Sequence, residues 1–237
     1  MTAKAATSLI LVAVVVTGCT AVTGSGDVIT IDVPIEGVSR LLVSHSFEVN
    51  VAVGEQPSLT LRVDDNLEAN LSVGLDGDTL RIGLEPRTGV SNATLEADLT
   101  VTSLEAIEGS GAVDIHLAIL TGSDFDLQLS GASELDGTLE FGSMTGEISG
   151  ASNLSLSGQV GTVDIGASGA SDLALLELEV DDLRIRLSGA SDAEITVNDS
   201  IEASLSGASS LRYRGDPEVN TLDVSGASSI GKVTEPG

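Results

Sequence analysis

The sequence predicts an all-β fold, a single-chain parallel β-helix (β-solenoid) with coils of about 19 residues and an N-terminal β-rich cap. The first observation is the tetrapeptide Ser-Gly-Ala-Ser, which occurs six times between Ser130 and Ser228. Successive copies begin 19, 19, 20, 18 and 19 residues apart, and a degenerate copy, Ser110-Gly111-Ala112-Val113, begins 20 residues before the first. A period of this kind is typical of stacked structural repeats.

The second observation is the alternation of aliphatic and polar residues on both sides of each tetrapeptide, which is the pattern of a strand with one buried face. Nineteen residues hold two or three short strands and their corners, so each repeat forms one coil about 4.8 Å from the next. One coil cannot bury its apolar face alone, but a stack of coils can. The position five residues after the first serine is held by Ile115, Leu135, Leu154, Leu173, Ala193, Leu211 and Ile230.

The third observation is the composition. The chain has 27 Gly but only three Phe, one Tyr and no Trp among 237 residues. Small side chains suit thin stacked coils, whose interior has little room for aromatic rings.

The N-terminus reads as a targeting segment over residues 1–18. Lys4 is followed by an apolar run from Leu9 to Val16, which is too short to span a bilayer. The run leads into Val16-Thr17-Gly18-Cys19, which resembles the lipobox of bacterial lipoproteins. We therefore expect a lipoprotein signal peptide, cleavage before Cys19 and acylation of this residue, the chain's one cysteine. Thr20 at the next position favours the outer membrane in a cell with two membranes.

The region after this anchor divides into a tether over 19–27, a β-rich region over 28–108, regular coils over 109–231 and a tail over 232–237. We expect the β-rich region to form the cap and first coils, because an open solenoid end exposes unpaired strand edges. The Asp76-Gly77 pair signals a hairpin. The expected strands are Val28–Val33, Arg40–Val43, Phe47–Val53, Ser58–Val63, Leu71–Val73, Thr79–Leu84 and Leu95–Val101.

The tetrapeptide itself is predicted to be the corner of each coil. Glycine permits a positive φ or a close approach of backbones, alanine leaves room for the next coil, and serine hydroxyls pair with backbone groups in the turn. A strand that runs unbroken through the corner would turn the glycine and the second serine inward; the alternative is a chain that kinks there. A catalytic role for these serines is disfavoured because no histidine follows His116 to activate them.

Four runs carry a resemblance to a known family: Arg40 to Val51, Leu59 to Leu67, Asp78 to Ile82 and Leu104 to Gly111. Together with the Ser-Gly-x-Ser repeats, they resemble the bacterial family called putative auto-transporter adhesin, head GIN domain, over residues 38–230. The resemblance implies a β-helical extracytoplasmic domain, often behind a lipoprotein signal. It implies no catalytic residues.

The charge of the chain limits its ligands. Once residues 1–18 are removed, 9 basic and 36 acidic residues leave a formal charge of −27. Nucleic acids and anionic lipids need a basic surface, so neither is expected as a direct ligand. The expected partners are the lipid bilayer, through acylated Cys19, and an unidentified protein or glycan.

A search for chemistry yields no catalytic, metal or cofactor residues. His45 and His116 have no Cys, Asp or Glu partner at a metal-ligand spacing in the sequence, so we read them as exposed or edge residues. The acidic positions after the corners, among them Asp172 and Asp192, fit a solvated turn, with a calcium site as the alternative. Tyr213 fits a larger core residue near the last coil, with a binding spot as the alternative.

The sequence therefore predicts a non-enzymatic, lipid-anchored cell-envelope protein that acts as an adhesin-like β-helical interaction module. The alternative is a structural or assembly lipoprotein that binds another envelope protein. A glycan-active β-helix enzyme is the less expected third hypothesis. The residues that would carry its activity are Asp164, Asp181, Asp182, Arg184 and Arg186.

Overall fold

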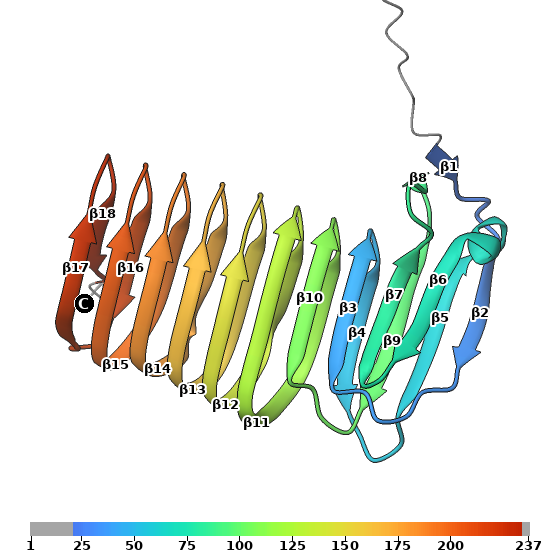
Figure 1. Cartoon of the computed structure of the whole chain (residues 1–237), viewed down its shortest axis with the longest axis horizontal. Helices are drawn as coiled ribbons and strands as arrows, with labels where there is room; N and C mark the ends of the chain where they lie inside the picture. Colours follow the sequence, from blue (N-terminus) through green and yellow to red (C-terminus); the bar gives the residue numbers. More distant parts are fainter. Residues whose placement is uncertain (1–20, 234–237) are drawn as a thin grey trace, which may run out of the picture.

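The computed structural model describes residues 21–233, which form a single elongated β-solenoid (Figure 1). The predicted signal peptide, Cys19 and the last four residues of the predicted tail lie outside the described residues. No helix within residues 21–233 is long and apolar enough to cross a membrane.

The regular coils confirm the predicted parallel solenoid. Their five long strands are β11 (Asp114–Gly131), β12 (Glu134–Ile148), β13 (Asn153–Ala167), β14 (Asp172–Leu187) and β15 (Asp192–Leu205). Each strand pairs in parallel with the next, and residues about one coil period apart lie side by side. The stack ends with β16 (Ser210–Arg214), β17 (Glu218–Val224) and β18 (Ser229–Lys232).

Each long strand wraps around the lower edge of the molecule and so contributes to two faces (Figure 1). We call the face formed by the segments that precede the corners face A, and the face formed by the segments that follow them face B. The strands β17 and β10 (Ala106–Gly111) belong to face A, whereas β16 and β18 belong to face B.

The N-terminal strands extend both faces, but their order in the stack differs from their order in the chain. On face A, β10 pairs with β3 (Arg40–His45), which pairs with β7 (Thr79–Leu84). On face B, β11 pairs with β4 (Glu48–Val53), which pairs with β9 (Leu95–Val101). The coil formed by β7 and β9 is therefore added outside the earlier coil of β3 and β4.

Antiparallel strands close the N-terminal end of the stack. On face B, β2 (Val28–Val33) pairs with β5 (Ser58–Asp64), which pairs with β9, and on face A β6 (Leu71–Asp76) pairs with β7. The 3-10 helix η1 (Asp65–Asn70) joins β5 to β6 and buries Leu67. The short strands β1 (Ala21–Thr23) and β8 (Gly89–Ser91) form a separate pair.

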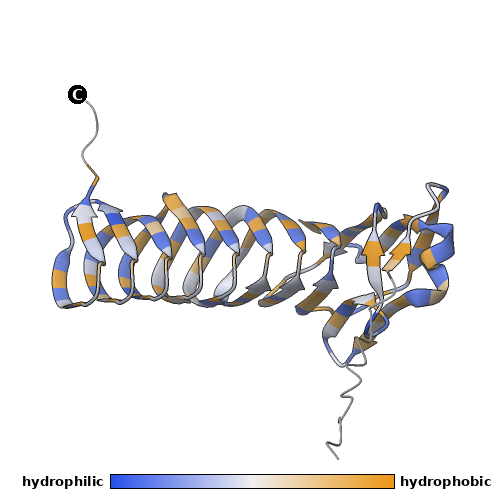
Figure 2. Cartoon of the chain, turned by 90° about the horizontal axis from the view of Figure 1, so that it is seen from above, coloured by the Kyte–Doolittle hydropathy of each residue, from blue (hydrophilic) through white to orange (hydrophobic). Residues whose placement is uncertain are grey.

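The core is one continuous column of aliphatic side chains between the faces. Figure 2 shows the alternation of hydrophobic and hydrophilic residues along the coils that produces it. Phe125 and Phe141 lie in neighbouring coils with their ring centroids 5.1 Å apart. The predicted inward row after the corner is buried from Ile115 to Leu211, and Ile230 in the last coil is half-buried.

The corners stack in one row along the upper edge of the molecule, and the chain kinks within each. The glycines of the seven copies have φ between +73° and +97°, and the alanine N–H that follows each donates to a corner carbonyl of the previous coil. The second serine is the inward residue, and its hydroxyl donates to the carbonyl of the first serine of the same corner. This bond measures 2.8 to 3.1 Å in the corners that contain Ser133, Ser152, Ser171, Ser191 and Ser209.

One further corner has no tetrapeptide. His45 has φ of +71° and pairs with Gly111, and its carbonyl accepts a hydrogen bond of 2.6 Å from the backbone N–H of Ala112. The segment from Ser44 to Phe47 therefore forms a corner of the same row, in which histidine holds the position of glycine.

Candidate functional site

The candidate site is a row of side chains along the outside of face B. The strand register places these side chains opposite one another from coil to coil, and in the regular coils they lie two residues beyond the position that directly follows each corner. We call this row the central row. Its members, from the cap to the last coil, are Asp32, Thr60, Asp98, Asn50, His116, Asp136, Ser155, Ala174, Glu194 and Arg212.

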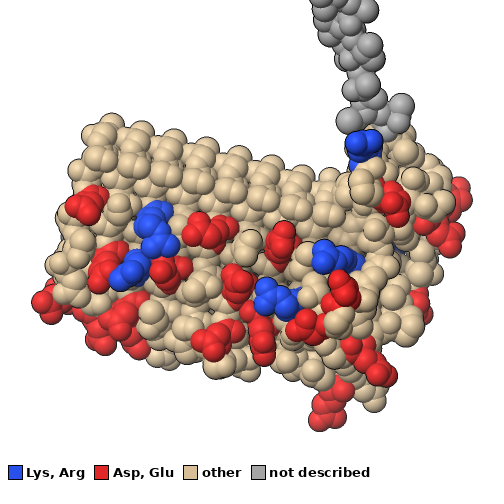
Figure 3. All heavy atoms as spheres, in the orientation of Figure 1, with Lys and Arg blue, Asp and Glu red and all other residues tan. Residues whose placement is uncertain are grey.

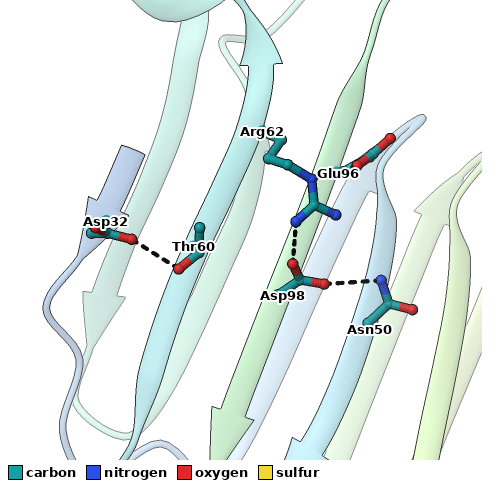
Figure 4. Close-up of polar contacts among 6 residues, drawn as sticks. All are labelled: Asp32, Asn50, Thr60, Arg62, Glu96 and Asp98. Carbon is teal, nitrogen blue, oxygen red and sulfur yellow. Dashed lines mark hydrogen bonds and ion pairs between the residues drawn. The ribbon is translucent and has the colours of Figure 1, made fainter. Parts of the chain in front are cut away.

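Hydrogen-bond donors and acceptors of neighbouring coils pair along the central row. Thr60 donates to Asp32 at 2.9 Å, and Asn50 donates to Asp98 at 3.0 Å (Figure 4). Further along, His116 pairs with Asp136, and Arg212 forms an ion pair with Glu194. These pairs hold side chains of different coils at fixed positions on a rigid sheet.

Arg62 joins three strands at the N-terminal part of the row. Its guanidinium bonds Glu96 at 2.7 Å and also bonds Asp98, and Asp98 in turn accepts from Asn50 (Figure 4). The hydrogen bond from Arg62 is the main reason why the pKa of Asp98 lies below its ordinary value. The carboxylate of Asp98 therefore stays ionised to a lower pH than an unpaired aspartate does, because the hydrogen bond from Arg62 lowers its pKa.

His116 lies between two carboxylates. Its Nδ1 is 2.5 Å from Oδ1 of Asp136 in the next coil, and its Nε2 is 3.5 Å from Oδ1 of Asp114 on the same strand. Partial burial is the largest single effect and lowers the pKa of His116, whereas the hydrogen bond to Asp136 raises it. The nearby carboxylates add to that effect, so the pKa of His116 is raised above 6.5.

The acidic partners of His116 were not recognised in the sequence. Asp114 is two residues before His116 and therefore lies on the same side of the strand. Asp136 is 20 residues after His116, one coil later, and the register pairs them. The coil period combined with strand alternation was the signal that would have found both. The other histidine, His45, accepts a hydrogen bond from the backbone N–H of Leu84 at 3.2 Å, so its role is to hold the corner.

Three neighbouring grooves run along face B. The first, about 360 Å³, lies around Asn50, Asp98 and His116. The second, about 430 Å³, lies between Asp136 and Glu194. The third, about 490 Å³, extends to Arg212. Adjacent grooves share lining residues, so they form one shallow channel along the stack.

The middle groove lies where the central row has its smallest side chains, Ser155 and Ala174. Leu117 and Leu156 contribute to its apolar floor. Polar groups surround this floor: the hydroxyls of Thr138, Ser155 and Ser157 and the carboxylates of Asp136, Glu177 and Glu194. The groove can therefore accept hydrogen bonds and attract positive charge.

The residues considered for an enzyme occupy other positions. Arg186 pairs with Asp164 at 2.9 Å on face A, and Arg184 pairs with Glu202 at 2.6 Å. Asp182 accepts a hydrogen bond from Ser200 at 2.6 Å. Of these five residues only Arg186 and Asp164 pair with each other, and Asp181 is half-buried in β14.

The remaining sequence candidates fall on face B. Asp172 and Asp192 are register partners in adjacent coils and line the third groove, and the calcium site considered for them stays a hypothesis. Tyr213 stacks on Ile195 and is half-buried against the core, as expected for a larger core residue near the last coil. The predicted site residue Cys19 lies outside the described residues.

Comparison with known proteins gives one family match. The family model described as "Putative auto-transporter adhesin, head GIN domain" matches residues 37–217. No curated protein sequence matches the chain.

Several solved structures share the fold. A putative adhesin from Bacteroides fragilis NCTC 9343 is 19% identical, with a TM-score of 0.83 over 90% of this chain and 100% of that one. A putative adhesin from Parabacteroides merdae ATCC 43184 is 18% identical, with a TM-score of 0.72 over 90% and 99%. A protein from Parabacteroides distasonis ATCC 8503 titled "Putative lipid binding protein" is 15% identical, with a TM-score of 0.68 over 91% and 100%.

Proposed function

The chain belongs to the putative auto-transporter adhesin, head GIN domain family, and from this premise we propose that it is a non-enzymatic, adhesin-like interaction module of the cell envelope. The family description indicates an extracytoplasmic protein. Its binding surface in this proposal is the channel along face B.

The observation that carries the proposal is the form of this channel. Three shallow grooves, each sharing lining residues with its neighbour, follow one another along the sheet and offer an extended surface that suits a macromolecular partner. Hydrogen bonds between neighbouring coils link several side chains of the central row and restrict their rotamers. A surface ordered before binding loses little side-chain entropy on association.

The charge of the channel selects the partner. Asp136, Glu177 and Glu194 line the middle groove, and the whole chain carries a formal net charge of −26. Complementary charge increases the rate of association and excludes partners of like charge. We therefore infer a protein partner whose contact surface carries Lys and Arg.

A groove-filling variant tests the binding surface. Ala174 is exposed in the middle groove, so Ala174→Trp is expected to lower binding to intact cell envelopes by at least about tenfold. Ser204→Trp is the matched control, because Ser204 is equally small and exposed but lies on face A. Equal binding by both variants contradicts the proposal. Binding that is insensitive to salt but competed by free glycans identifies a glycan in place of the cationic protein.

The second part of the proposal is the membrane anchor. The apolar run from Leu9 to Val16 and the lipobox ending at Cys19 support an acylated, membrane-attached mature protein. Cys19→Ser is expected to abolish incorporation of labelled palmitate and release the protein from the membrane fraction. If this variant stays in the membrane fraction unlabelled, the anchor is not the lipid at Cys19.

A further inference from the structure

We propose that His116 and Asp114 bind a divalent transition-metal ion, with Asp136 as the residue that orients the imidazole. Asp114, His116 and Asp136 each offer a ligand atom, and these atoms all lie within 4.8 Å of one another. The three residues come from two adjacent coils of paired strands. The site therefore depends on the solenoid register and does not require a loop to close.

The protonation of His116 follows from its partner. Asp136 offers only an acceptor when ionised, so the 2.5 Å contact requires a proton on Nδ1 of His116. This contact leaves Nε2 as the nitrogen that can coordinate a metal. An imidazole whose second nitrogen donates to a carboxylate is the usual arrangement of a metal-binding histidine, because the carboxylate fixes the tautomer and the ring orientation.

Asp114 supplies the second ligand atom. Its Oδ1 is 3.5 Å from Nε2 of His116, and metal–ligand bonds near 2.1 Å in a tetrahedral site place two ligand atoms about 3.4 Å apart. This same Oδ1 is shielded from solvent and accepts no hydrogen bond from the described residues. The Asp114 side chain as a whole is 46% exposed, so a cation can reach this oxygen from solvent and supply the partner that it lacks.

The surroundings of the pair favour a cation. Glu48 and Glu134 are the register partners of Asp114 in the two flanking coils, and the charge of Glu48 acts on His116. Arg62 of β5, which bonds Asp98 of the central row, is already bound to both Glu96 and Asp98. Glu48 and Glu134 therefore add negative charge beside the site.

The ligand chemistry selects the metal class. One imidazole nitrogen with carboxylate oxygens suits Zn²⁺ or Mn²⁺, whereas Ca²⁺ and Mg²⁺ prefer oxygen ligands alone. This site is distinct from the calcium hypothesis for Asp172 and Asp192, which lie in coils further along the stack and have no histidine beside them.

Isothermal titration of the purified protein, free of any affinity tag, with ZnCl₂ tests the proposal. We expect one Zn²⁺ per chain, bound at least about tenfold more tightly than Ca²⁺. His116→Gln is expected to abolish this site. Asp136→Asn is expected to weaken Zn²⁺ binding by about 10- to 100-fold, because it removes only the orienting carboxylate.

Asp192→Asn is the matched control. Asp192 holds the same position in its coil as Asp114 does, but it lies three coils beyond Glu134. Its substitution should therefore leave the Zn²⁺ affinity unchanged. Circular dichroism of each variant confirms that it is folded. Zn²⁺ binding that is equal in His116→Gln and in the parent protein, or no Zn²⁺ binding by the folded parent protein, overturns the proposal.

Discussion

At the scale of the residue, the corner serines explain why the tetrapeptide recurs. In five of the six complete corners the second serine is buried and gives its hydroxyl to the carbonyl of the first, three residues earlier. A polar group can occupy this inward position only because the hydrogen bond is internal to the turn. The sequence predicted that serine would pair with backbone groups but left open which serine faces inward.

Substitution of the inward serine should be more costly than substitution of its neighbour. Ser152→Ala leaves the carbonyl of Ser149 without its donor and is expected to lower the free energy of unfolding by about 1–3 kcal/mol. Ser149→Ala, in the same corner, loses only a long contact of 3.4 Å and should cost less than about 0.5 kcal/mol. Urea denaturation of both variants gives the comparison, and equal costs would contradict the assigned role of the inward hydroxyl.

The corner glycine is required for two reasons: its φ is positive, and the backbone of the preceding coil approaches it closely. Gly169 has φ of +88°, and a Cβ at this position would lie 2.3 Å from the carbonyl oxygen of Gly150. Gly169→Ala is therefore expected to cost more than about 2 kcal/mol, since two backbones must separate. Ala170→Ser, at the exposed neighbouring position, should change the free energy of unfolding by less than about 0.5 kcal/mol. Thermal denaturation that ranks Ala170→Ser as the more harmful change would refute this account.

His116 shows where reasoning from residues alone failed. Its partners are two residues before it and one coil after it, so neither belongs to a familiar ligand motif in the sequence. The coil period that predicts the inward core positions also relates the polar positions outside, and it pairs His116 with Asp136. The corner at His45 was not predicted either. There histidine takes the left-handed backbone conformation that glycine takes in the later coils.

At the scale of the element, alternation of aliphatic and polar residues located the strands well. The seven strands expected before the tetrapeptide region are all present, as β2 to β7 and β9, with bounds that differ by at most three residues. Their stacking order was not predictable from this pattern. Residues 79–101 lie outside the earlier coil of β3 and β4, and without a repeated corner there is no sequence period to count.

Arg62 and Asp98 join β5, β9 and β4 in a way that depends on pH. The pKa of Asp98 is lowered from its ordinary value of 3.8, chiefly by the hydrogen bond from Arg62. A group with a lowered pKa adds stability that is complete above its unfolded pKa and is lost as the pH falls through its folded pKa. We expect Arg62→Met to raise the pH midpoint of acid unfolding. Circular dichroism between pH 5 and pH 2 measures this midpoint, and an unchanged midpoint would show that the contact does not stabilise the fold.

The two ends of the stack should differ in local stability. At the N-terminal end, antiparallel strands and η1 cover the coil, and the buried carboxylate of Asp64 accepts backbone N–H groups of Gly26 and Thr94, each at 2.7 Å. In the last coil, β17 is exposed along its whole length and Val219, Leu222 and Val224 are uncovered.

Hydrogen exchange followed by mass spectrometry should detect this gradient. We expect β17 and β18 to exchange first and the central strands β13 and β14 to exchange last, because local opening is easiest where few apolar contacts hold a strand. Exchange that begins at β2 and β5 would contradict the assignment of these strands as a cap.

At the scale of the whole molecule, the excess of acid opposes folding. The chain carries 36 acidic and 10 basic residues. Figure 3 shows charged side chains across the face in view, whereas the ridge of corners above that face shows none. Salt screens the repulsion between exposed carboxylates. Raising NaCl from 10 to 200 mM should therefore raise Tm by roughly 2–5 °C. A fall in Tm would mean that ion pairs such as that of Arg184 and Glu202 dominate the electrostatics.

The sequence predicted the solenoid because every repeat carries the same corner and the same inward residues. The channel on face B could not be predicted in this way. It depends on how unlike side chains from different coils combine, such as the small Ser155 and Ala174 between the carboxylates of Asp136 and Glu194. The function proposed for this channel depends on the outward-facing residues, which differ from coil to coil.

Carboxylate footprinting of the protein bound to cell envelopes tests most directly whether face B is the binding surface. Carbodiimide labelling of free and bound protein, read by mass spectrometry, compares Asp136, Glu177 and Glu194 of the middle groove with Glu147, Asp164 and Glu202 of face A. We expect labelling of the first three to fall on binding while labelling of the other three is unchanged. Protection of the face A carboxylates with the groove left accessible would contradict the proposed binding surface.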